Sequence, residues 1–388
     1  MAESFTLKSF FSPSLVRRLA DSIANVHPRF PSAAFVKDAT RGLDALELID
    51  RARHLGRALK KHLPAGYPEA VELLVRSAGP ARPSDENLGG GMEPFFYYPH
   101  LWFVAEYGLD HFDLSMQAQA ELTKRFTAEF SIRPFIAREP ERTFGVLRRW
   151  ARDADAHVRR LVSEGTRLRL PWGTRVPWLD QNPRRILELL ELLKDDPSTM
   201  VRRSVANNLN DLGKVHPGLL YETCAAWLND ASPERRALVE HALRSAVKRG
   251  EPEALALLGF GARPAVTLED VRFEPRRVAI GGRVAMTFVL RSTSSRAQAL
   301  LVDTAVHFVK QSGRPAPKVF KLDRVSLAPR ARAALRTSFS LAVHTTRKPQ
   351  PGRHAVDVLV NGVSFRAGNF DVTPSAARPR RARAAARA

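Results

Sequence analysis

Apolar residues recur at helical spacing along the first two thirds of the chain. The spacing is clear in SLVRRLADSIANV and in PEAVELLVRSAG, where apolar residues stand three or four positions apart and charged residues lie between them. This period is typical of amphipathic helices. The aromatic segment FFYYPHLWFVAEYGLDHF, which begins at Phe95, is expected to pack into the same helical core. Residues 1 to about 260 are therefore predicted to be helical.

Three helical segments from residue 140 onward share one pattern. They are PERTFGVLRRWARD (140–153), PRRILELLELLKDD (183–196) and PGLLYETCAAWLND (217–230), each with Pro at the first position and Asp at the fourteenth. A second helical segment follows each of them. The prolines are 43 and then 34 residues apart, close to the period of two-helix HEAT-type repeats, about 40–47 residues. The pattern predicts a solenoid whose second helices line its concave surface.

The period of the pattern changes near Gly261. From Val266 to about Thr373 the chain contains seven short alternating segments separated by Gly, Pro, Asn or Ser, which is typical of an immunoglobulin-like sandwich. The sequence thus predicts an all-α HEAT-like solenoid over residues 1–262 and an all-β immunoglobulin-like sandwich over residues 263–374. Residues 375–388 have an Arg-rich composition without a core pattern, and we expect a disordered basic tail there.

The charge of the chain indicates a polyanionic partner. The net charge is +21 and Arg dominates the basic residues, which favours nucleic acid over a membrane because guanidinium groups match phosphate geometry. An Arg- and Ala-rich genome is the alternative explanation. The single cysteine, Cys224, excludes disulfides within the chain and thiolate-rich metal sites. With no apolar span of about 18 residues, we expect a cytoplasmic, nucleoid-associated monomer that needs no metal or cofactor and no membrane.

The segment HVRRLVSEGTRLRLPW, residues 157–172, carries the candidate chemistry. Arg160, Glu164 and Arg167 share one helical face by their spacing, and Trp172 follows the helix end. A solvated ladder of ion pairs, worth about 0.3–0.5 kcal/mol per pair, would give the same spacing.

The next repeat carries polar residues at the same rotation as this segment. Alignment of Val158 with Val201 places Arg160 on Arg203, Glu164 on Asn207, and Arg167 on Asn210. Because this polar face recurs from one repeat to the next, a functional groove becomes as reasonable an interpretation of Glu164 as a surface ion pair.

Three segments together resemble the AlkC branch of the HEAT-like DNA alkylation-repair glycosylases, which are relatives of AlkD. They are TAEFSIRPFI, HVRRLVSEGTRLRLPW and VRRSVANNLNDLGKVHP. The resemblance covers residues 1–260, and the second domain is similar to the immunoglobulin-like domain of some AlkC members. One departure is Leu168, which replaces the Pro of the family pattern EGTRPRLPW and leaves the shape of that loop in doubt.

The resemblance implies excision of N-alkylated bases, 3-methyladenine and 3-methylcytosine, from double-stranded DNA. Matched position by position, it makes Glu164 the catalytic carboxylate and places Glu129 in the lesion site, where we expect it to be the second catalytic residue. The lesion-binding residues are expected to be Trp172, Arg160, Arg167, Asp211 and Asn207, and the phosphate-binding residues Arg203, Arg159 and Asn210.

The chemistry of such a lesion agrees with a single carboxylate. A base methylated on a ring nitrogen is cationic and leaves as a neutral molecule, so that no general acid is required. The sugar develops positive charge, which Glu164 would stabilise while it orients a water molecule. The alternative is a HEAT scaffold without enzymatic activity that binds nucleic acid or an acidic protein, with Glu164 in an ion pair. The fold alone does not decide between them.

Overall fold

A computed structural model of the protein describes residues 6–81, 93–310, 315–343 and 348–374. They belong to two units, residues 1–243 and 244–388, which we describe separately. The predicted basic tail, residues 375–388, lies outside the described residues.

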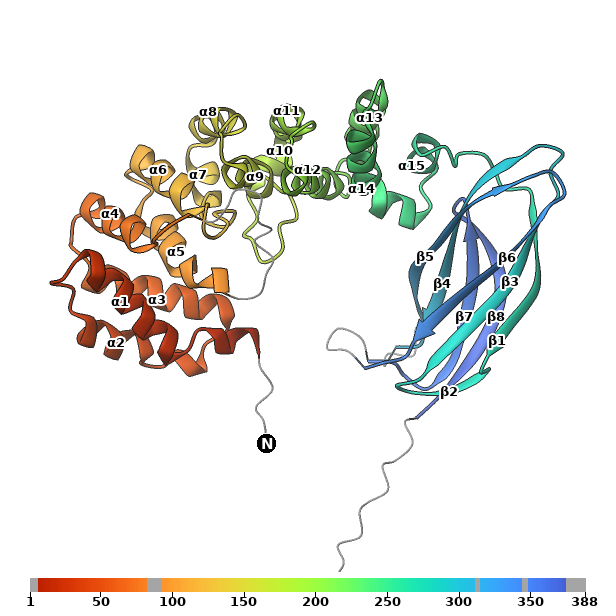
Figure 1. The fold of residues 1–388 in the computed structure, drawn as a ribbon, viewed down its shortest axis with the longest axis horizontal. Coiled ribbons are helices and arrows are strands. Elements are labelled where there is room, and N and C mark those ends of the chain that lie inside the picture. Colours follow the sequence, from red (N-terminus) through yellow and green to blue (C-terminus); the bar gives the residue numbers. More distant parts are fainter. Residues whose placement is uncertain (1–5, 82–92, 311–314, 344–347, 375–388) are drawn as a thin grey trace, which may run out of the picture. The chain divides into compact units, whose positions relative to one another are not determined.

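The first unit is built from helices stacked in chain order (Figure 1). Its α-helices are α1 (Pro13–Val26), α2 (Ser32–Thr40), α3 (Leu48–His62), α4 (Tyr67–Ser77), α5 (Tyr98–Tyr107), α6 (Phe112–Leu122), α7 (Arg133–Arg138), α8 (Pro140–Trp150), α9 (Ala156–Gly165), α10 (Pro177–Gln181), α11 (Pro183–Leu193), α12 (Thr199–Leu212), α13 (Pro217–Leu228) and α14 (Pro233–Arg249), the last of which continues into the second unit. Short 3₁₀ helices are η1 (Leu7–Phe10), η2 (Leu43–Ala45) and η3 (Glu93–Tyr97).

The repeats predicted from the sequence are confirmed. Helices α8, α11 and α13 begin at Pro140, Pro183 and Pro217. At the first position of a helix the backbone N–H makes no hydrogen bond within the helix, so proline, which lacks this N–H, fits there without loss. Helix α8 packs against α9, α11 packs against α12, and the second helices α9 and α12 pack against each other. The spacing from Pro140 to Pro183 is the longer one because the loop after α9 and the short helix α10 are inserted there. This insertion carries Trp172.

Fully buried aliphatic side chains form the apolar faces of α9 and α12. They are Val158, Leu161 and Val162 of α9 and Val201, Val205 and Leu209 of α12, all with no exposed surface. Because these residues recur three and four positions apart, each helix buries one apolar stripe in the core and leaves its polar face for the site.

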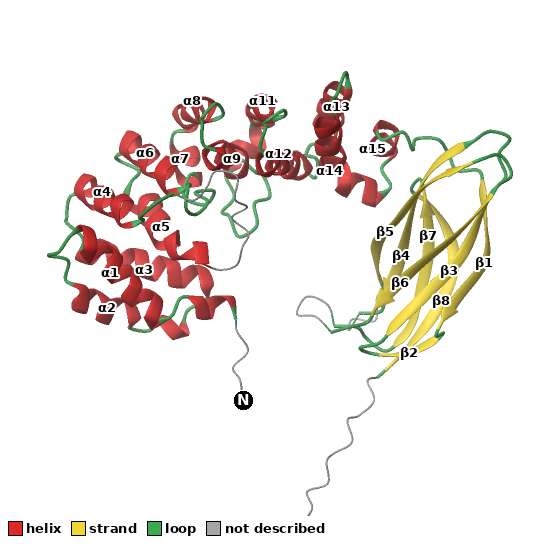
Figure 2. Ribbon diagram, in the orientation of Figure 1, coloured by secondary structure: helices red, strands yellow, loops and turns green. Residues whose placement is uncertain are grey.

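The second unit contains α15 (Pro252–Leu257) and a sandwich of two sheets (Figure 2). Its strands are β1 (Val266–Glu274), β2 (Arg277–Ala279), β3 (Arg283–Ser292), β4 (Gln298–Phe308), β5 (Ala316–Leu327), β6 (Arg332–Ser340), β7 (Gly352–Val360) and β8 (Val363–Thr373). The sheet orders are β1-β3-β6 and β2-β8-β7-β4-β5. The predicted two-domain fold, helices followed by a β-sandwich, is confirmed.

Alternation of buried and exposed residues explains the success of the strand prediction. In β3, Val284, Met286, Phe288 and Leu290 face the core, and the residues between them are less buried. The sequence missed β2, because three residues are too few to show alternation. The unit begins within α14, at Arg244, whereas the change from helix to strand comes at Val266. The predicted domain limits at 262/263 and 374/375 stay a prediction. Among the described residues, no helix is both long enough and apolar enough to cross a membrane.

His100 of α5 is a titratable side chain with no exposed surface. Its Nε2 lies 3.4 Å from Ser77 Oγ, and its Nδ1 has no hydrogen-bond partner among the described residues. Burial, aided by the positive charge of Arg125, lowers the pKa of His100 to about 4. The folded state therefore keeps this imidazole neutral under conditions in which the unfolded chain protonates it.

We predict that His100 makes the helical unit less stable in mild acid. Its pKa is near 6.5 in the unfolded chain and lower in the fold, so the unfolded state takes up more protons as the pH falls below 6.5. Between pH 7 and pH 5 this difference costs about 2 kcal/mol of unfolding free energy. Urea unfolding followed by helical circular dichroism, for the wild type and His100→Leu, measures it. Equal pH dependence in the two proteins would contradict the prediction.

Candidate active site

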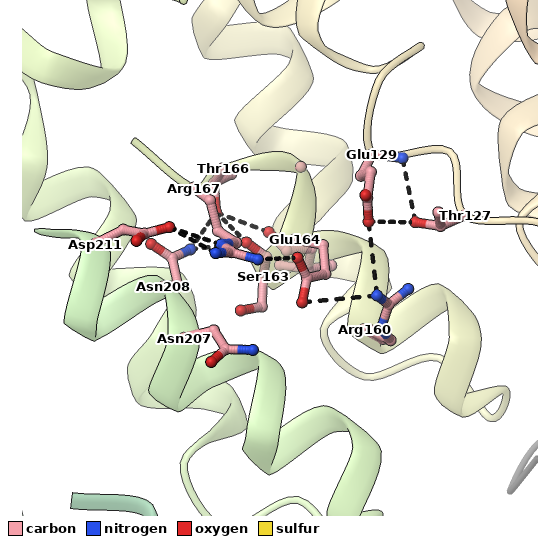
Figure 3. Close-up of polar contacts among 12 residues, drawn as sticks. Thr127, Glu129, Arg160, Ser163, Glu164, Thr166, Arg167, Asn207, Asn208 and Asp211 are labelled. Carbon is pink, nitrogen blue, oxygen red and sulfur yellow. Dashed lines mark hydrogen bonds and ion pairs between the residues drawn. The ribbon is translucent and has the colours of Figure 1, made fainter. Parts of the chain in front are cut away.

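The candidate site lies at the end of α9, where its last turn faces α12 (Figure 3). The start of α9 is fixed by Asp155, whose carboxylate accepts a hydrogen bond of 2.7 Å from the backbone N–H of His157. At the other end, Asn208 of α12 donates hydrogen bonds of 2.7 Å to the Ser163 carbonyl and 3.0 Å to Thr166 Oγ1. Hydrogen bonds at both ends of α9 therefore fix the helix that carries Glu164.

The Glu164 carboxylate is buried, with 5% of its side chain exposed. Arg167 Nη1 donates a 2.9 Å hydrogen bond to Oε2, and Arg160 Nη2 lies 3.7 Å from Oε1. Burial alone would raise the pKa of Glu164, but the two guanidinium groups reverse the effect and hold the pKa below its ordinary value. The interpretation of Glu164 as a solvated surface ion pair does not fit this environment.

Arg167 is shared between two carboxylates. Its Nε and Nη2 each lie 2.8 Å from Asp211 Oδ2, on the side away from Glu164. Asp211 is 2% exposed, and Lys214 Nζ donates a 2.8 Å hydrogen bond to its other oxygen. Because its guanidinium is bonded on both sides, Arg167 has little freedom to leave Glu164.

Glu129 approaches the site from the turn before α7. Its Oε2 accepts a 2.8 Å hydrogen bond from Thr127 Oγ1 and lies 3.6 Å from Arg160 Nη2. Burial and the negative charge of Glu164 raise the pKa of Glu129. Arg160 thus lies between two carboxylates whose pKa values are displaced in opposite directions, an arrangement found where neighbouring acids have different roles.

A pocket of about 390 Å³ opens over these residues. Aromatic side chains from three segments line it: Phe95 in η3, Phe126 and Phe130 on either side of Glu129, and Trp172 in the loop after α9. The Phe95 and Phe126 rings are 4.9 Å apart between centroids, and the Trp172 side chain is 59% exposed. Aromatic faces beside carboxylates suit a flat cation.

The structure brings most of the predicted site residues together. Glu164, Glu129, Arg160, Arg167, Trp172 and Asn207 all line the pocket, and Asp211 is joined to it through Arg167. Leu168, the departure from the family pattern, is buried, with 1% exposed. Among the described residues, no group of three or more His, Cys, Asp or Glu side chains is placed to hold a metal ion.

The three residues expected at DNA phosphates differ in their surroundings. Arg203 is exposed. The Arg159 guanidinium instead binds both oxygens of Asp196, at 2.6 and 3.0 Å, and Asn210 is 3% exposed. Contact of Arg159 or Asn210 with a phosphate would require local rearrangement, whereas Arg203 needs none.

The sequence analysis missed the phenylalanines of the pocket. The aromatic segment from Phe95 was expected to be core, and most of it is, as Phe96, Tyr98 and Phe103 show. Phe95 itself is only half-buried and faces the pocket. The one signal available for the others was the position of Phe126 and Phe130 next to Glu129 in RFTAEF.

Comparison with known proteins agrees with both units. The model of the C-terminal Ig-like domain of the uncharacterised protein YhaZ matches residues 267–374. YhaZ of Bacillus subtilis (strain 168) is 34% identical over 358 residues, which are 92% of this chain and 96% of YhaZ. A solved structure, the alkylpurine DNA glycosylase AlkC of Pseudomonas fluorescens bound to DNA with an abasic site analog, is 36% identical with a TM-score of 0.87, over 95% of this chain and all of that one. The chain belongs to the AlkC family of DNA glycosylases.

Membership of the AlkC family covers both the helical unit and the sandwich, because the match extends over the whole of the solved AlkC chain. The likeness is thus not limited to a shared repeat architecture.

We predict that the pKa of Glu129 depends on the charge of Glu164. Replacing Glu164 with Gln removes the negative charge that raises the pKa of Glu129, so this pKa should fall. Carbon-13 NMR titration of the glutamate carboxyl groups measures the change. Glu188→Gln is the matched control, because Glu188 also pairs with two arginines but 45% of its side chain is exposed. A Glu129 pKa that is the same in all three proteins would disprove the coupling.

Proposed function

We propose that this protein is a DNA glycosylase that removes cationic N-alkylated bases, 3-methyladenine and 3-methylcytosine, from double-stranded DNA. The observation that carries the proposal is the buried, ionised carboxylate of Glu164 in a pocket lined by aromatic rings. The similar AlkC of Pseudomonas fluorescens, an alkylpurine DNA glycosylase solved with DNA, supports it.

The reaction breaks the bond between the sugar C1′ and the ring nitrogen of the base. The electron pair of that bond goes to the base, which leaves neutral, and the positive charge passes to the sugar. The ionised Glu164 stabilises this charge, orients a water molecule toward C1′ and accepts its proton as the C1′–O bond forms. The products are the free base and an abasic sugar with a hydroxyl group on C1′. No step requires a metal or another cofactor.

The neighbouring residues keep Glu164 in the reactive state. Arg160 and Arg167 favour its ionised form and fix its two oxygens. Glu129 is the second acid of the pocket and, with its raised pKa, adds less negative charge to the site than an ordinary carboxylate would. Trp172 and the phenylalanines contact the cationic base or the sugar through their ring faces.

The exposed Arg203 and the net charge of +21 supply attraction to DNA phosphates. We propose that the protein acts as a monomer on duplex DNA, in the cytoplasm beside the bacterial nucleoid. In this role its affinity for undamaged duplex falls steeply with salt, since counterion release dominates such binding.

Glu164→Gln tests the role of the acid. The substitution keeps the shape of the side chain and removes its charge, so excision from a duplex with 3-methylcytosine or 3-methyladenine should fall about 10²- to 10⁴-fold. Binding to undamaged duplex should remain or tighten slightly. Glu188→Gln removes a carboxylate that bonds to Arg185 at 2.9 Å and Arg148 at 2.8 Å on the surface, and should excise at the wild-type rate.

The outcomes separate the glycosylase from a binding scaffold. A folded Glu164→Gln protein with wild-type excision would remove Glu164 from the mechanism and leave Glu129 and Asp211 as the acids to test. A wild-type protein that binds methylated DNA without releasing base would refute the proposed activity itself.

Trp172→Ala tests the aromatic contact. Excision should slow about 5- to 30-fold, the loss expected for a cation–π contact of about 1–2 kcal/mol. The thermal midpoint should hardly change, because the side chain is 59% exposed. Leu192→Ala, which shortens another exposed apolar side chain, is the control for both measurements. A wild-type excision rate in Trp172→Ala would show that the indole does not contact the reacting groups.

A further inference from the structure

Arg133, the first residue of α7, has the largest fully buried side chain among the described residues, with 1% exposed. Its Nε donates a 2.6 Å hydrogen bond to the Thr174 carbonyl. Its Nη1 donates hydrogen bonds of 2.9 Å to the Gly165 carbonyl and 3.0 Å to the Arg167 carbonyl. All the acceptors are backbone oxygens, and no carboxylate forms an ion pair with this guanidinium among the described residues.

Such a buried cation is costly unless it meets a specific need. Here the guanidinium supplies hydrogen-bond donors to carbonyl groups that have no donor within a helix. Gly165 ends α9 and Arg167 follows it, so their carbonyls have no partner one turn further on. A cation at a helix C-terminus is also favoured by the helix dipole. The burial still has a cost, which appears as a pKa of Arg133 lowered to about 10.

The three carbonyls lie at the two ends of one loop. The loop leaves α9 at Gly165 and returns at Thr174, and between these points it carries Arg167 and Trp172. Trp172 has a left-handed backbone, with φ of 62°, which is uncommon and unfavourable for a residue other than glycine. The guanidinium of Arg133 thus joins the two ends of this loop through hydrogen bonds to their carbonyls.

Arg133 also belongs to the segment that supplies the second acid. Glu129 stands four residues before it, in the turn that leads into α7. One end of this short segment thus brings a carboxylate to Arg160, and the other end holds the loop that brings Arg167 to Glu164. The two halves of the pocket are tied together through a side chain that does not line it.

We propose that Arg133 is a positioning residue, which sets the loop 165–174 so that Arg167 holds Glu164 and Trp172 meets the substrate in the reactive geometry. It touches neither the base nor the sugar and acts only through the loop. The inference depends on the proposed glycosylase activity for its kinetic part, and on the structure alone for the placement of Trp172.

The chain contains a matched control for this residue. Arg51 of α3 is 6% exposed and donates hydrogen bonds of 2.9–3.0 Å to the carbonyls of Leu46, Lys8, Phe11 and Asp44. It is therefore also a buried arginine bonded to backbone oxygens, but it lies in the N-terminal helices and holds no residue of the pocket. Arg51→Lys and Arg133→Lys make the same chemical change at the two places.

The experiment compares the wild type, Arg133→Lys and Arg51→Lys in three measurements. They are the thermal midpoint, the single-turnover excision rate on a duplex containing one 3-methylcytosine, and acrylamide quenching of Trp172 fluorescence, isolated by subtraction of the Trp172→Phe signal in each background. Trp172 is the most exposed of the five tryptophans. Arg133→Gln is added because it does not bury an ammonium group.

We expect both lysine variants to lose thermal stability, since a single ammonium cannot reach three or four carbonyls. Only the Arg133 variants should slow excision, by about 10- to 100-fold, the cost of small misplacement at a reacting centre. Only they should change the quenching of Trp172, and affinity for abasic duplex should stay within a few-fold of the wild type.

Two results overturn the inference. One is wild-type excision and quenching in a folded Arg133→Lys or Arg133→Gln protein. The other is an equal loss of rate in Arg51→Lys, which would make the effect one of general stability. If the wild type releases no base, the proposed function fails, and the quenching of Trp172 still decides whether Arg133 sets the loop.

Discussion

The candidate site depends on a row of largely buried side chains that alternate in charge. Beside and within the pocket, neighbouring side chains alternate in charge in the order Asp211, Arg167, Glu164, Arg160 and Glu129. Each would be expensive to bury alone, and removal of one partner leaves an uncompensated charge. The packing of α9 on α12 and the turn before α7 hold the members of the row at ion-pair distance from one another. The same arrangement leaves one carboxylate ionised and displaces the other toward its neutral form.

The fold followed from local patterns. Helix starts at Pro140, Pro183 and Pro217, and strands such as 283–292, are encoded within a few residues of where they occur. The polar face of α9 was predictable for the same reason. The burial of Glu164 was not, because it depends on α12, whose residues are more than 30 positions away. The contribution of Phe95 was likewise hidden, since a half-buried ring and a core ring have the same spacing in the sequence.

Glu129 shows where family resemblance and physical reasoning differ. The resemblance placed it in the lesion site without saying how it would differ from Glu164. The structure supplies the reason: Glu129 has one guanidinium at 3.6 Å and a hydroxyl donor, whereas Glu164 has two guanidinium groups, one at 2.9 Å. Two residues of the same type are therefore electrostatically unequal. This difference depends on distances between segments that are far apart in the sequence, and residue spacing along the chain does not give such distances.

The backbone of Trp172 places activity and stability in opposition at one position. A left-handed conformation costs an ordinary residue about 1–2 kcal/mol, and glycine adopts it freely. Selection for higher stability would therefore favour glycine at position 172, whereas selection for an aromatic ring in the pocket would favour tryptophan. Engineering this protein for higher thermal stability would therefore favour replacement of Trp172, even though the proposed function uses the indole in the pocket.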